Sequence, residues 1–171
     1  AYDWHTFLEF EFINTNADGG EMIEVLEDGS ILVAGYSSYN FLGPRGEAPL
    51  HKNSDPKQDM FLLKLDPTGE YLWHTFYGAA GKSDIARDIA VDGFDNIYLV
   101  GGSGATWNGP AGQLPKNPYS GTEGNIVILK LNDSGGYVAH TFYGPAVTGA
   151  SGNEIVVDGS TNMYVVANSG N

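Results

Sequence analysis

Three of the four histidines recur along the chain, and histidine is a common metal ligand and proton carrier near neutral pH. His74 and His140 stand 66 residues apart in the hexapeptides WHTFYG and AHTFYG, and His5 stands in the related WHTF. A zinc site needs ligands that converge within a few ångströms, whereas equivalent residues of successive repeats point apart. We therefore expect a structural role for these histidines and no metal site.

Two acidic turns carry oxygens of the kind that bind calcium. Residues 92–96 read DGFDN and residues 158–162 read DGSTN, but the spacing and the final glutamate of an EF-hand loop are absent. Asp and Asn also hydrogen-bond to their own backbone in tight turns. Turn formation is the role that we predict for both segments.

Catalytic motifs are not found in the sequence. No spacing among the 21 acidic residues marks a pair as the facing carboxylates of a glycosidase. The chain lacks a Gly-x-Ser-x-Gly elbow, a phosphate-binding loop and a dinucleotide fingerprint, and without cysteine it has no thiol nucleophile. We expect a protein that is not an enzyme and uses no cofactor.

Aromatic side chains gather in two long loops rich in Gly, Pro and Asn, at residues 36–57 and 103–124. This mixture occurs on carbohydrate-binding surfaces, because aromatic faces stack on sugar rings. Loop aromatics also serve to pack a loop onto its own sheet. If the loops bind glycans, Tyr39, Trp107 and Tyr119 are the candidate residues.

The tripeptide Asn132-Asp133-Ser134 matches the acceptor sequence for N-glycosylation and falls in a predicted exposed turn. Such tripeptides are common by chance. Asn132 is therefore a candidate glycosylation site only in an organism that glycosylates its surface proteins.

An internal repeat of 66 residues positions all of these groups. IAVDG at residues 89–93 returns as IVVDG at 155–159, and Lys-Leu at 64–65 returns at 130–131. The same offset relates Ile31 to Ile97 and Met163, without a gap from about residue 21 onward. One structural unit is therefore used several times along the chain.

Each unit reads as four short β-strands. In the second unit we expect them at about 86–91, 96–101, 125–131 and 137–143, separated by turn-forming sequences and one long loop. Strands such as IYLV and IVIL are apolar on both faces, so each sheet should be covered on both sides. Sheets stacked face to face around an axis, as the blades of a propeller are, meet this requirement.

The composition agrees with many strands joined by tight turns, since 42% of the residues are hydrophobic and 24 of 171 are glycine. A net charge of −13 argues against nucleic acid or an anionic membrane surface as a partner. No run approaches 18 apolar residues, so we expect no membrane insertion. The lack of cysteine leaves the compartment open and is compatible with secretion.

The sequence resembles the SBBP family of bacterial β-propeller repeats. The resemblance rests on motifs that follow the family's order of turn, loop and final strand, namely Asp92-Gly93 with Asn96-Ile97-Tyr98, Gly101-Gly102-Ser103, Ala105-Thr106-Trp107, Lys130-Leu131-Asn132 and HTFYG at 140–144. Two segments depart from the family pattern. The usual Gly-Gly-x-Gly after the last strand is reduced to GAAG at 78–81 and GPAV at 144–147, and the first unit has LEFEF at 8–12 in its place.

The resemblance implies a propeller-like all-β domain with about three blades, the third incomplete. We expect an N-terminal strand segment at 1–20, blade 1 at 21–81, blade 2 at 82–148 and a partial blade 3 at 149–171. The N-terminal strand, at 4–7, corresponds to the fourth strand of a unit, which gives eleven strands in all. Closed propellers use at least four blades, so either further repeats or other copies of the chain should supply the remaining surfaces.

The N-terminal segment LEFEF alternates strictly, with Leu8, Phe10 and Phe12 on one side of a predicted strand and two glutamates on the other. Such a strand can add to the open sheet edge of another molecule. The alternative is a long edge strand in its own blade, whose charges limit aggregation.

These features favour an extracellular or cell-surface structural protein that assembles with itself, by strand or blade complementation, into a homo-oligomer or a filament. The alternative is a fragment of a larger secreted propeller that acts as an adhesion or glycan-binding module.

Overall fold

The computed structural model describes residues 18–54 and 57–170, which form three antiparallel β-sheets and no helix. Two sheets have four strands and the third has two. The strands are β1 (Gly19–Val25), β2 (Ile31–Ser37), β3 (Asp59–Leu65) and β4 (Tyr71–Tyr77) in the first sheet, β5 (Asp84–Val91), β6 (Ile97–Ser103), β7 (Asn125–Leu131) and β8 (Tyr137–Tyr143) in the second, and β9 (Ala150–Val157) and β10 (Met163–Ser169) in the third.

The strands of each sheet follow one another in chain order, so each sheet is a simple antiparallel meander. This architecture confirms the predicted all-β fold with four-stranded repeat units. The bounds of β7 and β8 coincide with those expected from the sequence, and β5 and β6 begin or end within two residues of them. The predicted strand at 4–7 lies outside the described residues.

Tight turns join the strands at equivalent places in each repeat. In each sheet, one residue of the turn between the first and second strands has a positive φ. It is the same repeat position each time, with φ of 84° for Gly29, 60° for Asp95 and 63° for Thr161. Glycine tolerates this left-handed conformation and aspartate adopts it with modest strain, but a β-branched threonine does so only under strain. The repeat therefore imposes one backbone conformation on three different residues.

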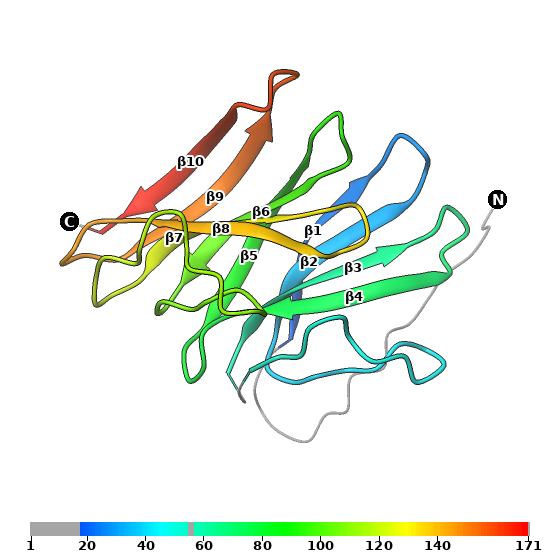
Figure 1. The fold of residues 1–171 in the computed structure, drawn as a ribbon, viewed down its shortest axis with the longest axis horizontal. Coiled ribbons are helices and arrows are strands. Elements are labelled where there is room, and N and C mark those ends of the chain that lie inside the picture. The colour runs from blue at the N-terminus through cyan, green and yellow to red at the C-terminus, as the bar shows by residue number, and fades with distance from the viewer. Residues whose placement is uncertain (1–17, 55–56, 171) are drawn as a thin grey trace.

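The three sheets are arranged one after another across the molecule, with β9 and β10 at one end (Figure 1). β5 contacts strands β1 to β3 of the first sheet, and β9 contacts strands β5 to β7 of the second. We call the face that a sheet turns toward the next sheet along the chain its forward face, and the opposite face its rear face. The forward face of one sheet packs against the rear face of the next.

Apolar side chains fill both of these interfaces. Between the first and second sheets, Leu32 and Leu62 of the forward face share a buried cluster with Leu99 and Leu129 of the rear face. Between the second and third sheets, a smaller cluster joins the forward face of the second sheet to Ile155. Burial on both faces explains the apolar runs IYLV of β6 and IVIL of β7 in the second sheet.

The rear face of the first sheet has a third cluster, covered in part by its own long loop. Phe41, from the loop between β2 and β3, packs against Phe61 and Phe76 of this face.

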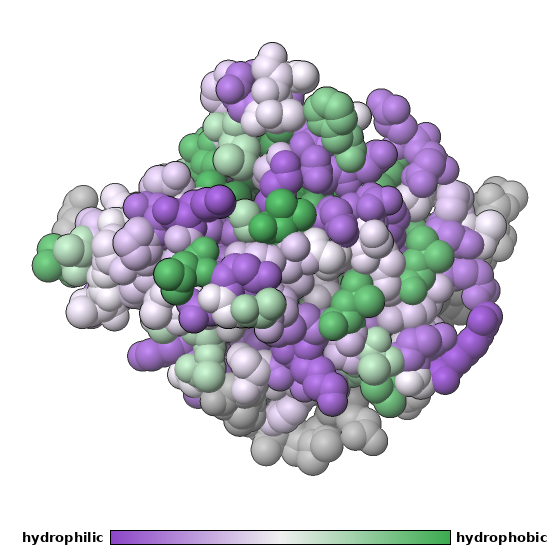
Figure 2. All heavy atoms as spheres, in the orientation of Figure 1, coloured by the Kyte–Doolittle hydropathy of each residue, from purple (hydrophilic) through white to green (hydrophobic). Residues whose placement is uncertain are grey.

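The described residues contain no helix that is long and apolar enough to cross a lipid bilayer. On the side of the molecule shown in Figure 2, hydrophobic residues are scattered among hydrophilic ones.

Candidate assembly site

The interface between the second and third sheets shows how two repeats recognise each other. Gly152 of β9 lies so close to β6 that a Cβ atom there would collide with the side chain of Val100. The equivalent residues one repeat earlier, Ala34 and Ala86, are both fully buried in the interface between the first and second sheets. The sequence thus places valine opposite glycine in one interface and alanine opposite alanine in the other.

A buried hydrogen bond adds to the packing between these sheets. The backbone N–H of Ile155 in β9 donates to Oδ2 of Asp88 in β5 at 2.8 Å. Asp88 is buried, so its carboxylate replaces the water that this amide would otherwise bind. The earlier interface has Met22 at the position of Asp88, and an ion pair of 3.8 Å between Arg87 and Glu21 spans it.

The forward face of the third sheet has the residues of an inter-sheet contact but is exposed. Tyr164 is 57% exposed, whereas its equivalent in the second sheet, Tyr98, is 3% exposed. Val166 is likewise exposed where Val100 is fully buried. Val156 lies on the same face and is also exposed.

The rear face of the first sheet is exposed along β1. Ile23 is 60% exposed, whereas its equivalent in the second sheet, Ile89, is 5% exposed. Val25 is exposed as well. Gly20 is exposed on this face, at the position that Ala86 and Gly152 occupy in the two internal interfaces.

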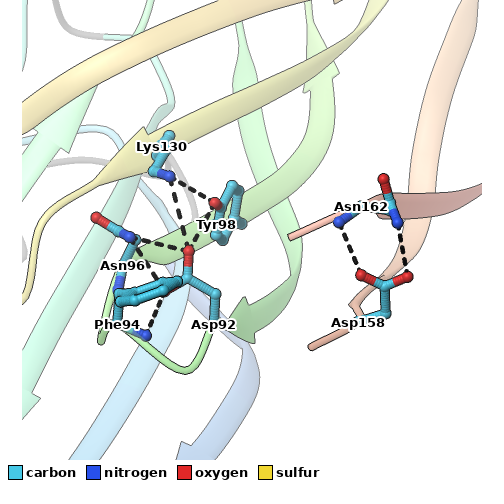
Figure 3. Close-up of polar contacts among 7 residues, drawn as sticks. All are labelled: Asp92, Phe94, Asn96, Tyr98, Lys130, Asp158 and Asn162. Carbon is cyan, nitrogen blue, oxygen red and sulfur yellow. Dashed lines mark hydrogen bonds and ion pairs between the residues drawn. The ribbon is translucent and has the colours of Figure 1, made fainter. Parts of the chain in front are cut away.

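A polar cluster at the start of β6, and in the turn that precedes it, organises the second sheet (Figure 3). Asp92 accepts hydrogen bonds from the backbone N–H groups of Phe94 and Asn96, and from the side chains of Asn96 and Tyr98. Lys130 of β7 donates to Tyr98 Oη at 2.6 Å and lies 3.7 Å from Asp92 Oδ2. Burial alone would raise the pKa of Asp92, but the hydrogen bonds outweigh it and hold the pKa at about 2.

The third sheet repeats most of this cluster at its surface. Asp158 accepts hydrogen bonds from Ser160 and Asn162 and from the hydroxyl of Tyr164. Hydrogen bonds, those from Asn162 first, lower the pKa of Asp158, which therefore carries a negative charge at neutral pH. The contacts in both turns confirm the turn role predicted for these acidic segments.

His74 and His140 make identical contacts within their own sheets. Each Nε2–H donates to a loop carbonyl at 2.9 Å, that of Phe41 or Trp107. Each Nδ1 accepts from a tyrosine hydroxyl, and burial lowers the pKa of both rings. These contacts fit the predicted structural role, and the described residues contain no cluster of three metal-binding side chains. His5 lies outside the described residues.

The three loop aromatics lie in different surroundings. Trp107 is buried, with its ring stacked 3.9 Å from that of His140. Tyr119 is half-buried and packs edge-on against Phe142, and its hydroxyl donates to Gly104 O. Tyr39 belongs to the loop of the first sheet and is half-buried. The long loop of the second sheet uses Trp107 and Tyr119 to pack onto its own sheet.

Two further predictions concern a glycosylation site and the N-terminal segment. The candidate glycosylation residue Asn132 is exposed in the turn between β7 and β8, where its Oδ1 accepts from the backbone N–H groups of Ser134 and Gly136. The predicted assembly strand with Leu8, Phe10 and Phe12 lies outside the described residues.

A pair of buried carboxylates at the junction of the first two sheets has no counterpart among the predicted site residues. Asp59 begins β3 and Asp84 begins β5, and both carboxylates lie beside Gly78. Burial raises the pKa of Asp84 to about 7, aided by the charge of Asp59 and opposed by a hydrogen bond from Ala79 N–H. The offset of 66 places Asn125 and Ala150 at the next junction, so the repeat pattern carries no signal for this pair.

Comparison with protein families identifies one segment of the chain. Residues 72–106 match the family model described as the SBBP beta-propeller repeat. The segment runs from β4 through β5 and β6 into the long loop, so it spans the passage from the first sheet to the second. A search of the curated proteins gave no match. The predicted SBBP-type repeat and its propeller-like blades are thereby confirmed.

Proposed function

We propose that this chain of SBBP-type β-propeller blades is an extracellular or cell-surface structural protein whose copies join blade to blade. In this proposal the forward face of the third sheet packs against the rear face of the first sheet of another copy. Such a contact uses two different surfaces, so it is heterologous and produces a ring or a filament.

The exposure of the two faces supports this proposal. Both have apolar residues whose repeat equivalents are buried between sheets, Tyr164 and Val166 on one face and Ile23 on the other. Covering these side chains removes apolar surface from water, at about 25 cal/mol per Å². The chain already contains two packed examples of the same interface.

Steric complementarity carries the proposal furthest. In the internal interfaces, Val100 lies against Gly152, and the equivalent residues Ala34 and Ala86 share one buried cluster. The pair between copies would be Val166 with Gly20, which again places a valine opposite a glycine. Close packing of this kind tolerates little added volume.

Polar complementarity points in the same direction. Glu154 occupies the repeat position of Asp88, and Ile23 occupies that of Ile155. In the contact between copies, the Glu154 carboxylate therefore faces the backbone N–H of Ile23, as Asp88 faces that of Ile155. Addition of the strand with Leu8, Phe10 and Phe12 to a sheet edge of the neighbouring copy is a second contact within the same proposal.

The extracellular location in this proposal rests on the resemblance to bacterial SBBP-type repeats, and the absence of cysteine is compatible with secretion. The location can be tested directly, because protease added to intact producing cells should degrade a protein that lies on the cell surface. The alternative of a glycan-binding module receives less support, because Trp107 is buried against His140. A glycan array probed with the native chain tests that alternative.

Sedimentation velocity over a range of concentrations tests self-assembly. We expect the native chain to form species larger than a monomer, and Val166→Glu to abolish them because the new carboxylate would be buried without a partner. Val147→Glu is the matched control, since Val147 is an exposed valine outside both faces. A native chain that stays monomeric at all concentrations would contradict the proposal.

A further inference from the structure

The two long loops are fastened to the last strands of their own sheets, β4 and β8. The first long loop joins β2 to β3 and is described for residues 38–54 and 57–58, and the second, residues 104–124, joins β6 to β7. Each loop exchanges two backbone hydrogen bonds with its strand, at positions that the repeat relates. They run from Leu50 N–H to His74 O and from Phe76 N–H to His51 O in the first sheet, and from Lys116 N–H to His140 O and from Phe142 N–H to Asn117 O in the second. These four amides report whether the loops are attached.

A buried histidine ring lies at the centre of each attachment. In the second sheet, His140 Nε2–H donates to the carbonyl oxygen of Trp107 at 2.9 Å, and the His140 ring stacks on the Trp107 ring at 3.9 Å. Its Nδ1 accepts from the hydroxyl of Tyr137 at 2.6 Å. In the first sheet, His74 bonds to and stacks on Phe41 in the same way. Each ring therefore holds a loop aromatic by its backbone and by its side chain.

This arrangement fits only the neutral form of the ring. A carbonyl oxygen can only accept, so Nε2 carries the proton and Nδ1 is left to accept from the tyrosine. A second proton, on Nδ1, would meet the hydrogen of the tyrosine hydroxyl and would leave a cation among apolar side chains. Burial accordingly lowers the pKa of both rings from 6.5.

A loop that has left its sheet exposes the histidine to water, where the ring binds a proton below about pH 6.5. The attached form is therefore at its most stable above this pH. As pH falls below 6.5, the detached form gains protons that the attached form resists, and the attachment weakens.

The charged neighbours of the two rings differ at one repeat position. At His74, burial dominates the pKa shift and the negative charge of Glu47, in the first loop, opposes it. The second loop has the neutral Gln113 at this position, and its Oε1 accepts from Ala111 N–H as Glu47 Oε2 accepts from Arg45 N–H. The geometry of the two loops is thus the same and their charge is not.

The other neighbours of the rings come from the adjacent strand and from the loops. Leu63 of β3 and Leu129 of β7 pair with the two histidines, and burial raises the pKa of Tyr71 and Tyr137 from 10.

The loops add one ionisable residue each. Lys116, which donates its backbone N–H to His140 O, is the charged residue of that contact. In the first loop, His51 Nδ1–H donates to Phe76 O at 2.8 Å, where the second loop has Asn117 donating to Phe142 O. A proton added to His51 leaves this donor in place.

We propose that His74 and His140 are acid-sensitive latches, which hold the long loops on their sheets while neutral and release them when protonated. Release breaks the backbone bonds between loop and strand and uncovers Phe76 and Phe142, against which Phe41 and Trp107 pack. No contact between copies is involved, so this inference goes beyond the proposed assembly and is independent of its outcome.

Hydrogen exchange of the native chain, read by mass spectrometry at pH 5 and pH 7.5, tests the latches. Labelling times are adjusted for the pH dependence of the chemical exchange rate. Segments 111–117 and 139–143 should lose protection by up to about tenfold for each pH unit below 6.5. The second loop should respond more strongly than the first, because Gln113 is neutral where Glu47 is charged. Equal protection of both loops at the two pH values would overturn the proposal.

Two variants assign the response to the rings. His140→Gln and His74→Gln keep a side-chain N–H donor but do not titrate. Each should abolish the pH dependence of its own loop and leave that of the other loop as an internal control. A variant loop that still loses protection in acid as the native loop does would overturn the role of its histidine. If a variant fails to fold, the comparison of the native chain at two pH values still decides.

His51→Asn is the matched control, since Asn117 occupies this position in the second loop. The first loop should keep its response to acid in this variant, because the latch is His74. Loss of the response would assign it to His51 and would overturn the latch of the first sheet.

Discussion

The carboxylate of Asp88 in β5 accepts a hydrogen bond from the backbone N–H of Ile155 in β9 at 2.8 Å, across the boundary between two blades. Asp88 is buried and Ile155 belongs to the apolar cluster of the same boundary. A side chain of one repeat thus recognises the backbone of the next. The same repeat positions in the exposed faces are occupied by Glu154 and Ile23.

Removal of the Asp88 carboxylate should loosen the third sheet. We expect Asp88→Ala to destabilise the chain by about 1–3 kcal/mol, because the Ile155 amide loses its buried partner. Asp88→Asn, which keeps an acceptor oxygen, should cost less. Hydrogen exchange measured by NMR should show faster exchange for the amides of β9 in the alanine variant, and equal exchange in both variants would argue against this role.

Relief of backbone strain should stabilise the turn between β9 and β10. Thr161 has a φ of 63°, whereas Gly29 occupies the same repeat position in the first sheet. We expect Thr161→Gly to raise the free energy of unfolding by about 1 kcal/mol, since glycine adopts this conformation without strain. Asp95→Gly should give a smaller gain. Urea unfolding curves measure both, and a destabilised Thr161→Gly variant would be the opposite of the expected result.

The buried Asp84 carboxyl should make stability fall as pH rises. Its folded pKa of about 7 lies above the unfolded value of 3.8, so the folded state holds the proton more tightly. Its contribution is complete below pH 3.8 and is lost between pH 3.8 and 7. Asp84→Asn mimics the protonated form. Over this pH range its free energy of unfolding, relative to that of the native chain, should rise by on the order of 2–4 kcal/mol.

Urea unfolding of the two chains between pH 4 and pH 8 measures this difference. The buried histidines titrate in both chains, and their effect therefore cancels in the comparison. Parallel pH profiles for the native chain and the variant would contradict a raised pKa for Asp84.

Lys130 should contribute more to stability than its repeat equivalent Lys64. Lys130 bonds to Tyr98 and lies close to the buried Asp92. Lys64 donates to the backbone oxygen of Asp133 at 3.5 Å, and its charge helps to lower the pKa of the exposed Asp28. We expect Lys130→Met to cost about 1–2 kcal/mol at neutral pH and Lys64→Met to cost less than about 0.5 kcal/mol. Thermal unfolding of the two variants provides the comparison, and similar losses would show that the cluster adds nothing.

The repeat, the strands and their turns could be predicted from the sequence, because alternation and turn residues are local signals. The assignment of residues to faces could not. A β-bulge shifts the register between Gly20 and Met22, and another shifts it between Ala86 and Asp88. Simple alternation would place Gly20 and Met22 on the same face, but the bulge places them on opposite faces.

The valine–glycine and alanine–alanine pairs follow from this bulge, so they become visible only when the sheets are stacked. The buried pair of Asp59 and Asp84 is a similar case, since the two residues start strands of different sheets. By contrast, the cluster of Asp92, Tyr98 and Lys130 joins neighbouring strands within one sheet. Its register follows from the strand pairing, and the repeat offset alone indicates that Asp158 and Tyr164 form its counterpart.

A mixing experiment with two blocked variants tests the heterologous contact most directly. Gly20→Leu blocks the rear face of the first sheet, and the nearest atom to its new Cβ is Val33 Cγ1 at 4.0 Å, so the fold has room for it. Val166→Glu blocks the forward face of the third sheet. Each variant alone should be monomeric, because each retains only one of the two surfaces.

When the two variants are mixed, one intact forward face and one intact rear face remain available. Sedimentation or light scattering should then show a dimer with one copy of each variant and nothing larger. A mixture that contains only monomers, or a single variant that still assembles, would contradict blade-to-blade assembly through these two faces.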